Sequence, residues 1–252
     1  MALVSTGALV LQTFPYSETS KVLRLYTREH GLRSVIAKGA LRPKSRFGGL
    51  LEPFTEGTAT FYMREGRDLH TLSGWDLVRA RQALGRSLSA FAGGSLLGEV
   101  VLRASTEEAH PEIYSALAEA WDGIAAAPTA TGAERAVLAG AWKLVSLLGF
   151  EPQTDACVAC GRPVAPDDPV RFDSLAGGVA CTRCRPVGRI LDPATRADVA
   201  RMSRGHVPSS LERPGAHRAL LRAFLDAQLA HDRPFRSMDL FLESHRDTEA
   251  QR

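Results

Sequence analysis

The segment KVLRLYTREHGLRSVIAK, residues 21–38, alternates apolar and polar side chains on both sides of a turn at Glu29-His30-Gly31. Alternation with a period of two is typical of half-buried β-strands. The segment therefore predicts a hairpin with strands at Lys21–Arg28 and Leu32–Lys38. Within the first of these strands, Leu23 and Leu25 share one face, which we expect to point into a core.

Three more strands are expected around this hairpin. Leu3–Phe14 is rich in Val, Leu and Thr and ends at Pro15, while Phe54–Met63 and Leu69–Leu77 alternate again. Five short strands within residues 1–79 predict a small closed barrel, and an OB-fold is the assignment that we favour. A five-stranded SH3-like barrel would leave a similar pattern in the sequence.

The positive charge of the chain is concentrated in the same region. The chain has 252 residues and a net charge of +3, yet Lys21–Arg46 holds eight basic residues and a single acid, Glu29. Such a cluster suggests a surface that meets a polyanion. The alternative is a charged strand that water solvates, with a loop tethered elsewhere.

An exposed face with cations around an aromatic ring suits single-stranded nucleic acid, whose phosphates pair with guanidinium groups while a base stacks on the ring. Strand alternation places Arg24, Tyr26 and Arg28 together on the outer face of the first hairpin strand. The loop after the hairpin adds three more cations, with Phe47 beside them. We therefore predict nucleic-acid contacts at Lys21, Arg24, Tyr26, Arg28, Arg33, Lys38, Arg42, Lys44 and Arg46.

After the last predicted strand the hydrophobic period changes to about 3.6, which predicts helices. Residues 80–150 form the first helical segment, in which glycines interrupt a long helical region at Leu84–Val101. Pro111 has the position of a first-turn proline, and Thr131–Glu134 has the pattern of a capping box. This segment therefore contributes the first part of a helical domain.

A second helical segment is expected at residues 191–245. It begins with Asp192-Pro193, which has the pattern of an N-cap followed by a first-turn proline. The polar residues 246–252 are predicted to be a frayed tail. Residues 151–190 differ from both segments, since they are rich in Pro, Gly and Cys, so they form an insert that splits the helical domain.

All four cysteines lie in this insert, as Cys157-Val158-Ala159-Cys160 and Cys181-Thr182-Arg183-Cys184. Two Cys-x-x-Cys pairs with this separation predict a tetrahedral zinc finger with the ligands Cys157, Cys160, Cys181 and Cys184. Four thiolates leave no open position for a catalytic water, so the zinc ion would be structural. Val170–Phe172 and Gly177–Val179 resemble a hairpin that brings the second pair back to the first. A redox pair and two disulfides are the less favoured alternatives.

The sequence offers no sign of an enzyme. The Gly-Lys pair of a phosphate-binding P-loop, the Gly-x-Gly-x-x-Gly pattern and the Gly-x-Ser-x-Gly elbow do not occur, and the seven histidines are scattered. No apolar stretch reaches the roughly 18 residues of a membrane-spanning helix. The N-terminus lacks the basic region and cleavage site of a secretory signal. We therefore expect a non-enzymatic cytoplasmic protein.

Several motifs resemble the bacterial RecO recombination-mediator family, and the resemblance covers essentially the whole chain. The most specific match runs from Ala37-Lys38-Gly39-Ala40 through Arg42–Phe54, and Gly7–Leu11 and Tyr16–Ser20 add to it. The resemblance implies an OB-fold that binds single- and double-stranded DNA, and it supports Lys38–Arg46 best among the predicted contacts. Some family members lack the cysteines, so the family's activity does not depend on the finger as such.

The same resemblance implies a function in DNA repair and recombination. It implies annealing of complementary strands and a complex with RecR that helps RecA displace single-strand-binding protein, whose acidic and apolar tail binds the helical domain. It implies no catalytic residues, and it places the protein at the nucleoid. The rival hypothesis is a scaffold in which the zinc finger docks a protein and the barrel does not bind DNA directly.

Overall fold

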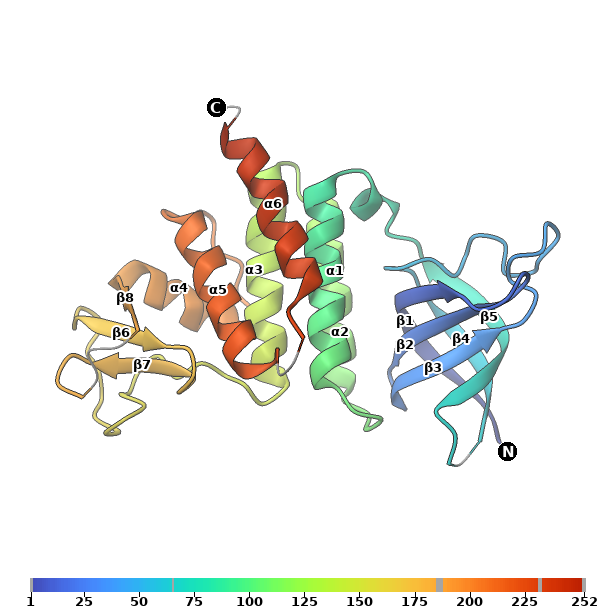
Figure 1. The fold of residues 1–252 in the computed structure, drawn as a ribbon, viewed down its shortest axis with the longest axis horizontal. Coiled ribbons are helices and arrows are strands. Elements are labelled where there is room, and N and C mark those ends of the chain that lie inside the picture. The colour runs from blue at the N-terminus through green and yellow to red at the C-terminus, as the bar shows by residue number, and fades with distance from the viewer. Residues whose placement is uncertain (1, 65, 185–187, 231–232, 251–252) are drawn as a thin grey trace.

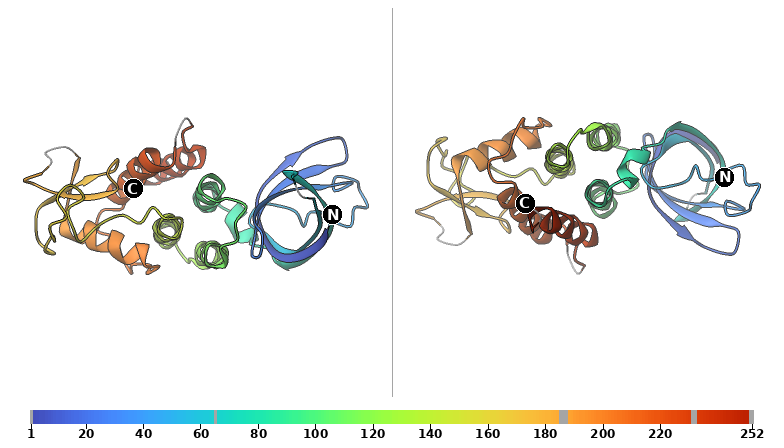
Figure 2. Two further views of the ribbon diagram at one scale, coloured as in Figure 1. Left: turned by 90° about the horizontal axis from the view of Figure 1, so that it is seen from below. Right: turned by 90° about the horizontal axis from the view of Figure 1, so that it is seen from above.

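A computed structural model describes residues 2–64, 66–184, 188–230 and 233–250 of the chain (Figure 1). A β-barrel lies at one end of the molecule, a bundle of helices occupies the middle, and a small three-stranded sheet lies at the other end. Figure 2 shows the same order from above and below. Among the described residues, no helix has the length and apolar character needed to cross a membrane.

The barrel contains the five predicted strands. They are β1 (Ala2–Pro15), β2 (Lys21–Thr27), β3 (Gly31–Ala37), β4 (Glu56–Met63) and β5 (Leu69–Arg79). β1 is long enough to pair with both β2 and β4, and β3 pairs with β5 in parallel, so the strand order β1-β2-β3-β5-β4 closes on itself. Leu23 and Leu25 point into its apolar interior, as the alternation predicts.

In the part of the chain that the structure describes, six α-helices and one 3₁₀ turn make up the helical part. They are η1 (Gln82–Gly85), α1 (Leu88–Ala104), α2 (Pro111–Ala126), α3 (Ala130–Leu147), α4 (Pro193–Ser203), α5 (Pro214–Gln228) and α6 (Arg236–Ala250). Pro111 and Pro193 each occupy the first turn of a helix, and the Asp192 side chain accepts the Thr195 N–H at 2.9 Å, as predicted.

Two predictions about helix ends and interruptions are wrong. The glycines of α1 do not break it: a Cβ on Gly93 would lie 2.3 Å from Val137, so the missing side chain lets α1 and α3 pack closely. Thr129, two residues before the predicted capping box, caps α3 by accepting the Gly132 N–H, while Glu134 is buried against Arg218. α6 runs to Ala250, so fraying of residues 246–250 stays a prediction about a helix end; Gln251 and Arg252 lie outside the described residues.

The barrel has its own apolar interior, and a few residues of its outer side also pack into the apolar core of the helices. Leu9, Tyr26 and Phe54 of the barrel side pack in the same cluster as Trp121 of α2, and the rings of Phe54 and Trp121 lie 5.4 Å apart. Arg81, which follows β5, is buried beside this cluster. A single buried cluster across the junction ties the barrel to the helices through apolar contacts.

The insert folds into a small sheet in the order β7-β6-β8, made of β6 (Val170–Asp173), β7 (Gly178–Cys181) and β8 (Arg189–Leu191). β6 and β7 form the predicted antiparallel hairpin. Phe172 lies 6.1 Å from the Phe224 ring of α5, which in turn lies 5.0 Å from Trp142 of α3. The apolar side of the insert therefore packs on the helices.

Candidate metal centre and nucleic-acid interface

The four cysteines converge at one point of the insert. Their Sγ atoms all lie within 4.8 Å of one another. The chain after the first pair turns tightly, since Gly161 has φ = +70° and its N–H donates to the Cys157 carbonyl at 2.8 Å. The Cys181 N–H donates to the Cys157 Sγ at 3.3 Å, which joins the two pairs. The predicted ligand residues are thus brought together.

These cysteines have the geometry and the chemistry of a metal site. Four sulfurs around an ion with metal–sulfur bonds of about 2.3 Å stand about 3.8 Å apart, which the observed spread accommodates. The backbone N–H of Cys181 is the main cause that lowers the pKa of Cys157, to about 6. Hydrogen bonds with Cys160 and Cys181 raise the pKa of Cys184 to about 12. A cation between the sulfurs would offset the repulsion among four thiolates.

A basic loop, residues 38–49, links β3 to the segment before β4. Its four cations, Lys38, Arg42, Lys44 and Arg46, are exposed to solvent. The loop is anchored because Phe47 is only 3% exposed and packs in the barrel core, with Leu51 just beyond the loop. The loop also donates the Leu41 N–H to the Thr19 carbonyl at 2.9 Å, which joins it to the turn between β1 and β2.

Comparisons with known proteins agree with this architecture. The family model described as "Recombination protein O N terminal" matches residues 1–81, and "Recombination protein O C terminal" matches residues 85–239. The chain belongs to the RecO family. The first match ends just after the barrel, and the second covers α1 to α5, the finger and the start of α6.

Two relatives within the RecO family show how far the likeness extends. A DNA repair protein RecO from Anaeromyxobacter sp. (strain K) is 36% identical over 239 residues, which cover 90% of this chain and 91% of the relative. A DNA repair protein RecO from Rubrobacter xylanophilus is 30% identical over 235 residues, which cover 92% of this chain and 93% of the relative. The family serves DNA repair and recombination.

One residue of the predicted interface does not have the expected surroundings in this RecO-family chain. Tyr26 lies on the outer face of β2, as alternation predicts, but this face packs against the helices and Tyr26 is 0% exposed. Its hydroxyl donates to the His110 carbonyl at 3.4 Å, and burial raises its pKa to about 12. The expectation of an exposed stacking ring at Tyr26 is therefore wrong.

The other predicted cations of β2 and β3 lie in different surroundings. Lys21 forms an ion pair with Glu52 at 2.7 Å, and Arg33 forms one with Glu107 at 2.9 Å. The guanidinium of Arg28 lies 4.5 Å from the ring centre of Tyr114 at the junction with α2. Arg24 lines a groove between the barrel and α1. Only the cations of the basic loop thus form one exposed group.

Two exposed aromatic residues beside the basic loop escaped the sequence analysis. Phe14 is 48% exposed and Tyr16 is 62% exposed, at the end of β1 and the start of the turn that receives the Leu41 N–H. Their position in the sequence could have indicated this exposure, because they lie on either side of Pro15, which ends β1. Both rings therefore lie at the tip of the first hairpin. They are better placed for base stacking than Tyr26.

A second groove lies on the helical part, between α2, α3 and the end of α4. It holds about 280 Å³ and has a floor of small residues, which are Ala116, Ala120, Ala136, Ala139 and Gly140. Lys143 and Arg204 bring two positive charges to its edge against one negative charge from Glu119, and Val207 is an exposed apolar side chain of the lining. The groove therefore combines a cationic edge with an apolar surface.

Proposed function

We propose that this RecO-family protein binds single- and double-stranded DNA through the basic loop and the neighbouring turn at residues 16–20. The observation that carries the proposal is that four exposed cations are held on a loop whose Phe47 is anchored in the barrel. An anchored loop loses less conformational entropy on binding than a free one. The strand order of the barrel supports its assignment as an OB-fold, a fold that often binds nucleic acid.

A salt-titrated binding assay tests this proposal. The triple variant Arg42→Glu/Lys44→Glu/Arg46→Glu should bind a labelled single-stranded oligonucleotide at least about a hundredfold more weakly, with a shallower dependence on salt. A matched control reverses three exposed arginines far from the loop: Arg162→Glu/Arg189→Glu/Arg213→Glu. Equal affinities of the two triple variants would remove the basic loop from the proposal.

Within the family's function, the protein would act without catalysis, at the nucleoid, by annealing complementary strands and by working with RecR to load RecA. The groove with Lys143 and Arg204 supports a site for the acidic and apolar tail of single-strand-binding protein, because it matches both properties of that tail. Lys143→Glu should weaken binding of a synthetic tail peptide and leave oligonucleotide binding intact. Unchanged peptide binding would exclude this groove.

We also propose that the metal of the finger is zinc with a structural function. A set of four thiolates is typical of structural zinc sites. The rival scaffold hypothesis makes the finger a docking surface and denies DNA binding by the barrel. It would gain support if the wild-type protein, with its metal bound, failed to bind oligonucleotides at low salt.

A further inference from the structure

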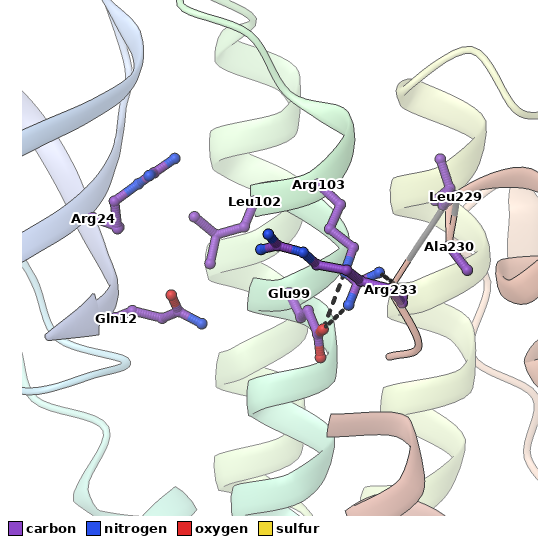
Figure 3. A pocket seen from close by; sticks show the side chains of 8 residues that line it. All are labelled: Gln12, Arg24, Glu99, Leu102, Arg103, Leu229, Ala230 and Arg233. Atoms are coloured by element: carbon purple, nitrogen blue, oxygen red, sulfur yellow. Dashed lines mark hydrogen bonds and ion pairs between the residues drawn. The ribbon is translucent and has the colours of Figure 1, made fainter. Parts of the chain in front are cut away.

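A groove of about 440 Å³ runs between the barrel and the helical part (Figure 3). On the barrel side it is lined by Gln12 of β1 and Arg24 of β2, which lie opposite each other in the antiparallel pair. On the helical side it is lined by α1 and by the end of the segment that connects α5 to α6, including Arg233. The groove thus draws its polar side chains from two parts of the fold.

One arginine of the groove is fully engaged by its neighbours. Arg103 of α1 donates to the Glu99 carboxylate at 2.6 and 3.1 Å, and its guanidinium lies 4.0 Å from the ring centre of Phe235. It also donates to the Pro234 carbonyl at 2.6 Å. The second oxygen of Glu99 accepts the Ser237 N–H at 2.9 Å. Arg103 and Glu99 therefore balance each other and fix the chain that carries Arg233.

The other two arginines keep their charge uncompensated. Among the side chains that the structure describes, which end at residue 245, neither Arg24 nor Arg233 has an ion-pair partner. The Arg24 Nε is inaccessible to solvent and has no hydrogen-bond partner there. A buried donor without an acceptor costs free energy. An anion in the groove would balance the charges of the two guanidinium groups that line it.

We infer that this groove binds a phosphate group of a nucleic-acid backbone between Arg24 and Arg233. The inference rests on the proposed DNA binding and extends it to a second site that includes the helical part. A guanidinium matches the paired oxygens of a phosphate, and the amide of Gln12 is a further donor on the same wall. Figure 3 shows Arg24 and Gln12 on one side and Arg233 reaching across from the other.

The course of β2 favours a nucleic-acid phosphate over an acidic peptide. Lys21 and Arg24 lie on the same strand, about 10 Å apart along it. Lys21 follows the turn that is hydrogen-bonded to the basic loop. The side chains of Lys21 and Arg24 point to opposite faces of β2, but the groove lies only about 10 Å along the strand from the turn at the basic loop, so one DNA strand could reach both. The groove would then place successive phosphates of one strand on the barrel and against the helices.

A double-mutant cycle with the full, metal-bound chain tests the inference. The probe is a labelled 30-nucleotide oligothymidine, titrated with Arg24→Gln, Arg233→Gln, the double variant and the control Arg162→Gln, which removes an exposed charge from the finger. Each groove variant should bind the oligonucleotide about five- to tenfold more weakly. The slope of log affinity against log salt concentration should become shallower by about one. The double variant should lose less than the product of the two, because both side chains hold one phosphate.

The outcomes separate the groove from the basic loop. If Arg233→Gln binds like the control while the basic-loop triple variant is impaired, the groove inference is overturned and the proposed function stands. If the wild-type protein does not bind the oligonucleotide, the groove inference and the proposed function are both refuted. An octaglutamate peptide serves as a second probe. If Arg233→Gln abolishes binding of this peptide but leaves the affinity for the oligonucleotide unchanged, the groove binds an acidic peptide and the phosphate inference is overturned. Arg233 is exposed, so its variant is expected to fold even if Arg24→Gln does not.

Discussion

Arg81 and Glu56 form an ion pair of 2.7 Å in which the Arg81 side chain is 1% exposed and that of Glu56 is 16% exposed. The same guanidinium meets Asp122 of α2 at 2.6 Å and donates to the Phe54 carbonyl at 3.2 Å. Arg81 therefore links the barrel, through β4, to the helices.

Arg81→Met should lower the free energy of unfolding by about 3 kcal/mol, because two carboxylates lose their buried cation. Chemical unfolding monitored by circular dichroism measures the change. Arg79→Met is the control, since Arg79 also pairs with Asp122 but its side chain is 55% exposed, so about 1 kcal/mol or less is expected. Equal losses in the two variants would contradict a special contribution of Arg81.

The stability of the helical part should fall at acidic pH through His217. This residue of α5 is 1% exposed, and burial is the main cause that lowers its pKa below the ordinary value of 6.5. The unfolded chain takes up a proton near pH 6.5 while the folded chain does not, so stability is present above that pH and is lost as the pH falls below it.

The measurement compares the free energy of unfolding at pH 7.5 and pH 5.0 in the wild type and in His217→Gln. The variant should lose less stability on acidification, because it has no imidazole to protonate. His206→Gln, at an exposed position, is the control and should keep the wild-type difference. The Asp198 carboxylate, 3.3 Å from His217, opposes the effect. An identical pH dependence in wild type and His217→Gln would show that attraction by the Asp198 carboxylate cancels the effect of burying His217.

Loss of the metal should loosen the finger without unfolding the helices. Phe172 of the finger packs on Phe224, so part of the insert is supported by the helical core as well as by the ligands. Cys181→Ser/Cys184→Ser should bind far less than the one zinc ion expected per chain and should be cleaved by protease within residues 151–190.

Elemental analysis and mass spectrometry of the fragments measure both effects, and Thr182→Ser is a control that leaves the ligands in place. Oligonucleotide binding by the barrel should persist in the cysteine variant. Protease resistance equal to that of the wild type would mean that packing alone holds the insert.

Local patterns were enough to predict the strands and the cysteine cluster, because both depend on neighbours in sequence. Alternation along β2 correctly separates Leu23 from Arg24, since adjacent side chains point to opposite faces. It cannot show that the outer face is covered, because the partner of Tyr26 is His110, far along the chain. For the same reason the groove of Arg24 and Arg233 and the buried pair of Glu134 and Arg218 were invisible in the sequence.

The exposed ring at Tyr16 provides the sharpest test of how single-stranded DNA is held. Stacking of one base on an aromatic side chain contributes about 1–3 kcal/mol, so Tyr16→Ala should weaken binding of single-stranded oligothymidine by at least about fivefold. Duplex binding should change less, because paired bases cannot stack on the ring. Tyr16→Phe, which keeps the ring, should retain wild-type affinity.

Tyr62→Ala is the matched control, since Tyr62 is 37% exposed on β4 of the same barrel but lies outside the turn that is hydrogen-bonded to the basic loop. Fluorescence anisotropy with single-stranded and duplex probes of equal length compares the variants at one salt concentration. If Tyr16→Phe loses as much affinity for the single-stranded probe as Tyr16→Ala does, the hydroxyl group and not the ring is the cause. Equal losses of single-stranded and duplex binding in Tyr16→Ala would argue for a contact with the backbone, because only stacking distinguishes an unpaired base.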